Sequence, residues 1–453
     1  MERRRISFSP PDITDLEIAE ATDALRSGWI TTGPRVKLLE RRLAAYIDTS
    51  DTTIDCETDE SKALYSNRVV CLNSATASEE LNLRVLGIQP GDEVIVPAYT
   101  YTSTASAAVH CGAKVIFADI QKDGDKNTHA PEMDYEKVAA AITEKTKAII
   151  PVDLGGVVCD YDRLFEIVES KRSLFNPLND HSDPLTDLGS RIQKGLGRIA
   201  IVADCAHSLG ANRVVFHTDK GLTTNIRRNC GAIADFSSFS FHAVKNFTTA
   251  EGGAATWHLP QSVYDSSVTD EELYKMYQLL SLHGQSKDAL TKTKDGVWDY
   301  DVIGAWYKFN MTDIAAAIGL KQLDRYKALI NRRIEIVKKY DSACRELGIT
   351  HLIHHTNQMD SSNHLYLIRI PGITEKQRNA MIVKLAEVGV PTNVHYKPLP
   401  MMTAYKKGLN LEDYRNSIDY YSNLITLPFH TLLSDDDVDY ICEVLKDIVK
   451  KAR

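Results

Sequence analysis

From residue 68 onward, short runs of apolar and β-branched residues alternate with segments of helical periodicity. This alternation constrains the fold more than any other feature. We read five of the runs as strands, at residues 69–73, 93–97, 114–118, 147–152 and 199–203. They are apolar almost throughout, which is typical of strands in a parallel sheet that is covered on both faces. The chain therefore predicts an α/β fold with a mostly parallel sheet flanked by helices.

The pattern of apolar residues changes after about residue 260. Helical patterns dominate at 311–329 and 331–347, followed by a strand at 364–370 and helices at 375–388 and 435–450. We therefore predict a large domain over residues 1–260, a helical connection over 261–330 and a smaller C-terminal α+β domain over 331–453. Two polar segments, 48–67 and 171–196, have the composition of surface insertions.

Composition excludes several classes of protein. The net charge of −8 gives no reason to expect binding to nucleic acid or to an acidic membrane. No apolar stretch approaches the roughly 20 residues of a membrane span, and the basic start lacks the apolar core of a signal peptide. The eight cysteines are scattered without a CxxC pair. We expect reduced thiols, no metal site and a cytoplasmic protein without a membrane partner.

Lys245 is the residue that points most clearly to chemistry. It lies in a run of small, apolar and hydroxyl residues followed by a Gly-Gly pair, where a solvated surface lysine is not expected. Upstream, an apolar strand ends in a lone carboxylate, Asp204. A lysine that can form an imine and an aspartate at the end of a strand are what pyridoxal phosphate (PLP) requires. The carboxylate keeps the pyridine nitrogen of the cofactor protonated.

Weaker signals accompany this pair, and each has a plainer interpretation. Residues 73–78 fit either an anion site at a helix start or an ordinary helix cap. Tyr101 fits a ring-stacking aromatic or a core residue, and Ser240 a phosphate donor or a strand-end hydroxyl. His207 fits a cofactor neighbour or a structural histidine. The glycines of 251–253 fit a close approach of two backbones or a common turn.

The order of these features matches the fold-type I PLP enzymes, and further motifs extend the match. The chain resembles the DegT/StrS family of PLP-dependent sugar-nucleotide aminotransferases over nearly its whole length. The motifs that carry the resemblance include Gly28-Trp-Ile-Thr-Thr-Gly-Pro34, Gly91-Asp-Glu-Val-Ile-Val-Pro97, Asp204-Cys-Ala-His-Ser-Leu-Gly-Ala211, Ser240-Phe-His-Ala-Val-Lys245, His283-Gly, Asn310-Met-Thr-Asp and Val394-His-Tyr-Lys-Pro-Leu399.

The resemblance implies roles for individual residues. Lys245 is the expected catalytic lysine, which binds PLP covalently and then carries the proton; Asp204 is the expected partner of the pyridine nitrogen. The other cofactor-binding residues it implies are Ser74, Ala75, Thr76, Tyr101, His207 and Ser240, together with Lys308 and Asn310. The last two are expected to reach the site of the other subunit in a homodimer with shared active sites. The residues expected to approach the substrate are Trp29, Thr31, His283, His395 and Tyr396.

The implied reaction moves an amino group from glutamate, through PLP and its pyridoxamine form, to a keto nucleotide sugar for a surface polysaccharide or glycan. The segment 283–289, with 298–300 and 308–311, resembles relatives that aminate UDP-linked 4-keto-6-deoxy sugars. A sister activity, 3-dehydration, is disfavoured because such enzymes carry histidine where Lys245 stands. A non-catalytic regulatory protein of the same fold is disfavoured because Lys245 and Asp204 are both present. Two departures from the family pattern, Ala203 and His207, leave the core chemistry unchanged.

Overall fold

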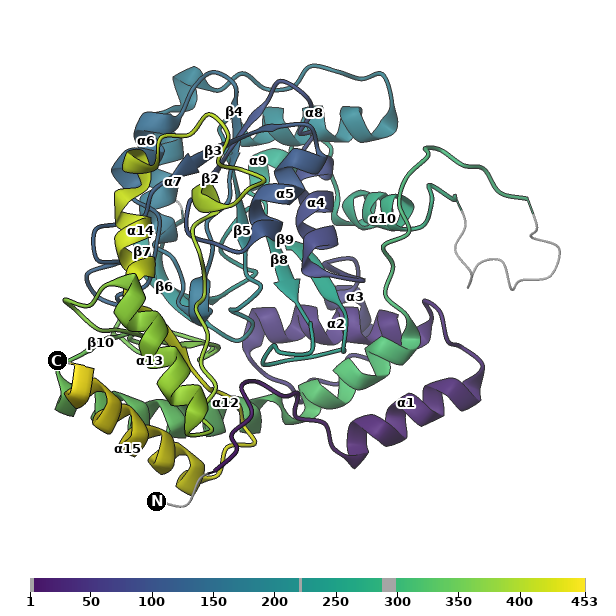
Figure 1. The fold of residues 1–453 in the computed structure, drawn as a ribbon. Helices are drawn as coiled ribbons and strands as arrows, with labels where there is room; N and C mark the ends of the chain where they lie inside the picture. The colour runs from purple at the N-terminus through teal and green to yellow at the C-terminus, as the bar shows by residue number, and fades with distance from the viewer. Residues whose placement is uncertain (1–3, 220–221, 287–298, 453) are drawn as a thin grey trace.

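The computed structural model describes residues 4–219, 222–286 and 299–452, and its centre is a seven-stranded sheet between two layers of helices (Figure 1). The strand order is β1-β9-β8-β5-β4-β2-β3, and β9 alone runs antiparallel to its neighbours in this sheet. The bounds are β1 Val69–Leu72, β2 Glu93–Pro97, β3 Lys114–Ala118, β4 Thr146–Ile149, β5 Ala200–Asp204, β8 Phe236–Ser240 and β9 Gly253–Trp257. The predicted α/β architecture is confirmed.

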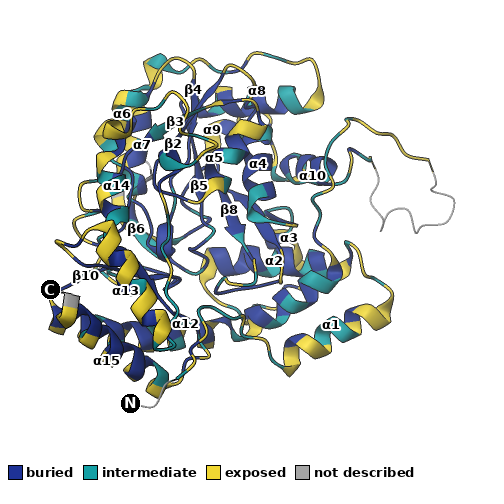
Figure 2. Ribbon diagram, viewed as in Figure 1, coloured by how far each residue is buried: buried dark blue, intermediate teal, exposed yellow. Residues whose placement is uncertain are grey.

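Successive side chains of a strand enter different cores, as the alternation of strand geometry requires. Val94 and Val96 of β2 pack into one apolar cluster, whereas Ile95 between them packs into the other. Both faces of the sheet are therefore buried (Figure 2). This explains why the sequence of the five predicted strands is apolar almost throughout.

The two layers contain different helices. One face of the sheet is covered by α4 Ala75–Val85, α5 Thr102–His110, α8 Pro184–Leu196 and α10 Asp270–Ser281, with the short α9 Gln261–Tyr264 beside them. The other face is covered by α2 Pro34–Thr49, α6 Tyr135–Ala141, α7 Tyr161–Ser170 and the first half of α12 Asp313–Leu347. Helix α1 Asp15–Ser27 packs on α12, and α3 Asp59–Tyr65 packs on α2.

Helix α12 connects the central sheet to a third apolar cluster. Its first half contributes Leu323 and Tyr326 to the large core, and its second half contributes Ile336 and Tyr340 to the C-terminal one. That cluster also contains residues of the sheet β10-β12-β13 and of two helices, with bounds β10 Thr350–His351, β12 Tyr366–Arg369, β13 Leu424–Leu427, α13 Glu375–Glu387 and α15 Asp435–Ala452. Helix α14 Arg415–Ser422 precedes β13. The sequence had suggested two helical segments here, and the boundary predicted at 330 falls inside this one helix. The division into three domains stays a prediction.

Two regions differ from the sequence-based expectation. A third sheet, β11-β6-β7, contains a long hairpin that the sequence did not predict, with bounds β6 Asn212–Asp219, β7 Leu222–Asn229 and β11 Met359–Asp360. The segment 171–196 is not only a surface insertion, because Leu188, Ile192 and Leu196 of α8 are buried in the core. None of the helices in the described part of the chain is long and apolar enough to span a membrane.

Candidate active site

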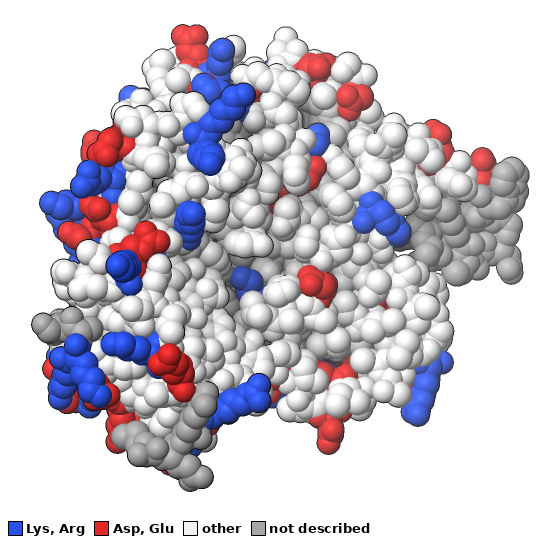
Figure 3. All heavy atoms as spheres, in the orientation of Figure 1, with Lys and Arg blue, Asp and Glu red and all other residues white. Residues whose placement is uncertain are grey.

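A pocket of about 410 Å³ opens where the chain leaves the parallel strands β2, β4, β5 and β8. The C-terminal ends of parallel strands meet at one edge of a sheet, and this edge is where open α/β folds bind ligands. In the space-filling view the molecule is hollowed near its centre, and a basic side chain reaches the surface there (Figure 3). The lining residues are Ser74, Ala75, Thr76, Thr100, Tyr101, Ser103, Val152, Asp204, Ala206, His207, Ser240, His242, Val244, Lys245, Glu251, Gly252, His395 and Tyr396.

Lys245 and Asp204 lie in this pocket together. Lys245 is half-buried in the connection between β8 and β9, and its N–H donates to the carbonyl of His242 at 2.9 Å. Burial lowers the pKa of Lys245 to about 8, although the charge of Asp204 acts in the opposite direction. At pH 7 roughly a tenth of this lysine is therefore neutral, far more than of an ordinary lysine, and an imine-forming or proton-carrying amine requires this neutral form.

Asp204 is the last residue of β5 and is 4% exposed. Burial raises the pKa of its carboxyl group, and two hydrogen bonds oppose that shift. Thr104 donates its hydroxyl to Oδ2 at 2.8 Å, and the N–H of Ala206 donates to Oδ1 at 3.1 Å. Thr104 was not predicted from the sequence, because only the tertiary structure brings α5 next to the end of β5.

One end of the pocket contains the N-terminus of helix α4. The first N–H groups of a helix have no partner within the helix, and Ala75 and Thr76 are the first two residues of α4. Ser74 is the N-cap and accepts the N–H of Ala77 at 3.1 Å. A methyl group at Gly253 would lie 2.4 Å from the carbonyl carbon of Ser74. The Gly-Gly pair therefore lets β9 pass directly beneath the start of α4.

The middle of the pocket is lined by rings. Tyr101 is 56% exposed, which rules out a core role, and its ring lies 5.6 Å from that of Tyr396. His207 accepts the N–H of Gly155 on Nδ1 at 3.1 Å and faces the Tyr396 hydroxyl through Nε2 at 3.4 Å. Burial and the charge of Lys245 hold the pKa of His207 well below its usual value, so the imidazole is neutral.

Two of the five predicted substrate residues, His395 and Tyr396, line the pocket, and the other three do not. Trp29, Thr31 and His283 lie outside the lining, as do Lys308 and Asn310, which were expected to serve the other subunit. These segments adjoin one another and the start of α4 through the hydrogen bonds Asn310 Nδ2–Thr32 Oγ1 at 2.7 Å, Asp313 N–Thr31 O at 2.9 Å, His283 N–Tyr307 O at 2.8 Å and Asn73 N–Phe309 O at 2.7 Å.

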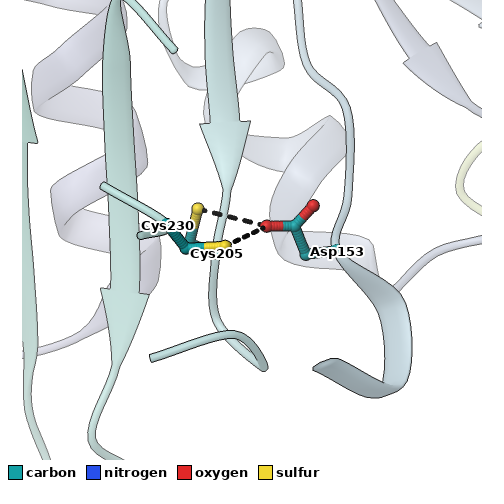
Figure 4. Close-up of side chains that lie close together, drawn as sticks. All are labelled: Asp153, Cys205 and Cys230. Carbon is teal, nitrogen blue, oxygen red and sulfur yellow. Dashed lines mark hydrogen bonds between the residues drawn. The ribbon is translucent and has the colours of Figure 1, made fainter. Parts of the chain in front are cut away.

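Behind the pocket, Asp153 lies close to Cys205 and Cys230 (Figure 4). All three are buried, and the thiols donate to Oδ2 of Asp153 at 3.5 and 3.3 Å. The Ser208 hydroxyl donates to the same oxygen at 2.8 Å, and Tyr161 donates to Oδ1 at 3.1 Å. Burial raises the pKa of both thiols, which keeps them protonated as donors. The cluster is therefore accounted for as a buried carboxylate that anchors the turn after Asp204.

Taken together, these residues fit PLP. Helix-terminal N–H groups and Ser240 suit its phosphate, a ring-lined middle suits the pyridine, and Asp204 and Lys245 suit the ring nitrogen and the aldehyde. An α/β protein with this site belongs to the PLP-dependent enzymes of fold type I.

Comparison with known proteins makes the assignment specific. The chain belongs to the DegT/DnrJ/EryC1/StrS aminotransferase family, whose model matches residues 11–174 and 192–446. It is accordingly a PLP-dependent aminotransferase. The internal gap in this match, residues 175–191, falls within the predicted insertion 171–196.

Individual relatives agree with the family. Spr1654 of Streptococcus pneumoniae, assigned as a sugar aminotransferase and solved in its PMP form, is 49% identical with a TM-score of 0.85, covering 99% of this chain and all of that one. The spore coat polysaccharide biosynthesis protein SpsC of Bacillus subtilis is 34% identical over 99% of this chain and 98% of its own. The UDP-4-amino-4-deoxy-L-arabinose–oxoglutarate aminotransferase of Shewanella sediminis is 30% identical over 99% of both chains.

Proposed function

We propose that this aminotransferase transfers the amino group of glutamate to the keto carbon of a UDP-linked 4-keto-6-deoxy sugar, for the synthesis of a surface polysaccharide or glycan. The name of the Shewanella relative supports the nucleotide and the donor. It pairs a UDP-linked 4-amino sugar with oxoglutarate, the keto acid that glutamate becomes when it loses its amino group. The name of SpsC supports a polysaccharide product. The segment that first suggested UDP lies partly in residues 287–298, outside the described residues.

The observation that carries the proposal is the position of Lys245 and Asp204 in one pocket. When bound, PLP supplies a carbon that takes up the amino group and a ring that draws electrons from it. Asp204, whose ionised form is stabilised by the hydrogen bond from Thr104, would supply the negative charge that keeps the ring nitrogen protonated. His207 lines the same pocket as Asp204, and because its imidazole is neutral it adds no positive charge next to the carboxylate.

Lys245 moves the proton in the proposed reaction. Its Nζ removes the proton from the α-carbon of glutamate and later delivers a proton to the sugar carbon that becomes the new stereocentre. A pKa of about 8 suits both steps, because the amine gains and loses a proton near neutral pH. We assign His395 and Tyr396, which also line the pocket, to orienting the sugar. Burial lowers the pKa of His395 to about 4, so it acts as a neutral hydrogen-bonding group.

We further propose a homodimer with shared active sites, in which Lys308 and Asn310 serve the pocket of the other subunit. Two facts support this: both lie outside the pocket of their own chain, and α1 exposes Leu16, Ile18 and Leu25 at 54–57%. A Lys245→Ala chain mixed with a Lys308→Ala/Asn310→Ala chain should recover part of the activity, because one of the two mixed sites is intact. An active monomer in solution would contradict the shared site.

The substrate is tested with a panel of 3-keto and 4-keto nucleotide sugars carrying UDP, dTDP or GDP. The protein is incubated with PLP and glutamate, and the amino sugar is detected by mass spectrometry. We expect amination of the UDP-linked 4-keto sugar, and none by Lys245→Ala. If only a 3-keto sugar or another nucleotide is aminated, the substrate assignment is wrong. If the panel yields dehydrated sugar instead, the reaction class is wrong.

A further inference from the structure

The segment 361–364, between β11 and β12, reaches from the C-terminal part of the chain to the back of the pocket. It contains His364, which is 4% exposed, and it contacts Asn246, the residue that directly follows Lys245. Nδ1 of His364 lies 3.0 Å from Oδ1 of Asn246, and the Asn246 amide donates to the carbonyl of Ser362 at 2.7 Å. Both ends of this amide, itself 9% exposed, are therefore held by the same segment.

The same segment also contacts His207 from behind. The ring centroids of His364 and His207 are 4.5 Å apart, and the hydroxyl of Ser362 donates to the His207 carbonyl. The N–H of His364 donates to the carbonyl of Gly155 at 3.1 Å, and the N–H of Gly155 in turn donates to Nδ1 of His207. A methyl group at Gly156 would lie 2.1 Å from the Ser362 hydroxyl, so this approach requires glycine.

We propose that His364 and Asn246 are positioning residues for the cofactor site. One buried hydrogen-bonded unit fixes the backbone beside Lys245 on one side and the ring of His207 on the other. A lysine has four rotatable bonds, so the position of Nζ depends on a backbone that stays in place. His364 is neutral, because burial together with His207 and Lys245 holds its pKa well below the usual value. Its Nδ1–H then donates to Asn246, consistent with the amide orientation that the bond to Ser362 requires.

This inference concerns the PLP site and does not depend on which sugar is used. Its test is a set of four variants: Asn246→Ala, His364→Leu, His364→Asn and, as a matched control, His351→Leu. Asparagine places an amide nitrogen near the position of the histidine Nδ1, so His364→Asn keeps a donor. His351 is also a buried histidine of the C-terminal part, 8% exposed, and its Nδ1 contacts the carbonyl of Leu352 instead.

The readouts are the PLP dissociation constant of the apoprotein, the circular dichroism of the bound cofactor in the visible range and the thermal midpoint of the apoprotein. Loss of the buried hydrogen bond should weaken PLP binding about tenfold in Asn246→Ala and in His364→Leu. Both should also reduce the cofactor signal, because the ring is held less firmly. His364→Asn should recover most of the PLP affinity and of the dichroism. A fifth variant that combines Asn246→Ala with His364→Leu should bind PLP no more weakly than the poorer of the two single variants, since both substitutions act through one contact.

Two outcomes would overturn the positioning role. One is that His364→Leu and Asn246→Ala bind PLP with the affinity and the dichroism of the wild type, measured in parallel. The other is that His351→Leu loses PLP and signal to the same extent as His364→Leu at an equal fall in thermal midpoint, because the effect would then be general destabilisation.

Discussion

The hydroxyl of Thr104 offers a sharp test of how the site controls the charge of Asp204. Thr104 is fully buried, donates to Oδ2 of Asp204 at 2.8 Å and meets the hydroxyl of Thr100 at 2.9 Å. Thr104→Val keeps the shape of the side chain and removes the donor. Because water does not reach this position, nothing replaces the lost hydrogen bond.

The expected magnitude follows from the partner's charge. A hydrogen bond to an ionised group contributes about 1.5–3 kcal/mol, which corresponds to a factor of roughly 10 to 150 in an equilibrium constant. The bond stabilises ionised Asp204 more than protonated Asp204, so its removal raises a pKa that burial already raises. PLP requires the ionised form. The loss of PLP affinity should therefore be largest at low pH, where the free carboxyl is protonated, and should shrink as pH rises through the pKa of the variant.

The assay is a PLP titration of the apoprotein by visible absorbance, repeated across the acidic to mildly alkaline range. Thr104→Ser keeps the hydroxyl and should resemble the wild type. Thr100→Val removes a hydroxyl that contacts Thr104 rather than Asp204 and should have a much smaller effect. Wild-type affinity of Thr104→Val at every pH would refute the reasoning.

Three further predictions concern other buried groups. The rate at which Lys245 of the apoprotein reacts with PLP should rise with pH and level off above about pH 8, since burial lowers the pKa of Lys245 to about 8. A rate that keeps rising toward pH 10.5, the ordinary lysine pKa, would contradict a lowered pKa. Glu79 is 1% exposed, and burial and the charge of Asp204 raise its pKa well above the usual value, so the native state holds the proton more tightly than the unfolded chain. The wild type should consequently lose about 1.4 kcal/mol of stability per pH unit between the two pKa values, and Glu79→Gln should not, so that the gap between their unfolding midpoints widens with pH. Asp153→Asn places an amide group among hydrogen-bond donors and should lower the free energy of unfolding of the apoprotein by about 2 kcal/mol or more, measured by thermal unfolding. A metal ion found at stoichiometric level in the wild type by elemental analysis would contradict a purely hydrogen-bonded cluster.

The sequence predicted five of the seven strands of the central sheet, because those five are apolar on both faces. Strands β8 and β9 are also buried, but they were missed because serine, glycine, alanine and threonine make up most of their residues. For β2 and β3 the predicted bounds, 93–97 and 114–118, match the structure. The hairpin β6–β7 was missed because its residues, such as Arg213, Asn225 and Arg227, do not form an apolar run. Helix α12 was divided in two because its apolar residues change from one core to another, although no glycine or proline interrupts the helix near residue 330.

The start of α4 shows where residue spacing alone is misleading. Thr76 and Glu79 have the spacing of a capping box, but the N-cap is Ser74, and Glu79 points into the protein with Oε1 unpartnered. Spacing alone does not distinguish a first-turn glutamate in solvent from one that faces the sheet. The phosphate-binding role assigned to residues 74–76 is unaffected and stays a prediction.

For the site, the sequence identified the residues that chemistry requires at defined places in the fold. A carboxylate at a strand end and a lysine among small residues are visible in one dimension, and Asp204 and Lys245 do share a pocket. Thr104, Asn246 and His364 were missed because their importance arises from contacts between segments far apart in the chain. The roles of residues expected to cross between subunits stay predictions for the same reason, since they depend on a surface that a second chain would cover.

The central claim, that Lys245 is the residue that binds PLP covalently, is tested most directly by trapping the link. The protein is loaded with PLP, reduced with borohydride, digested and mapped by mass spectrometry. The pyridoxyl mass should appear on the peptide that contains Lys245, and Lys245→Ala should lack the stable label. A label on another lysine at full occupancy, or an active Lys245→Ala enzyme, would contradict the account.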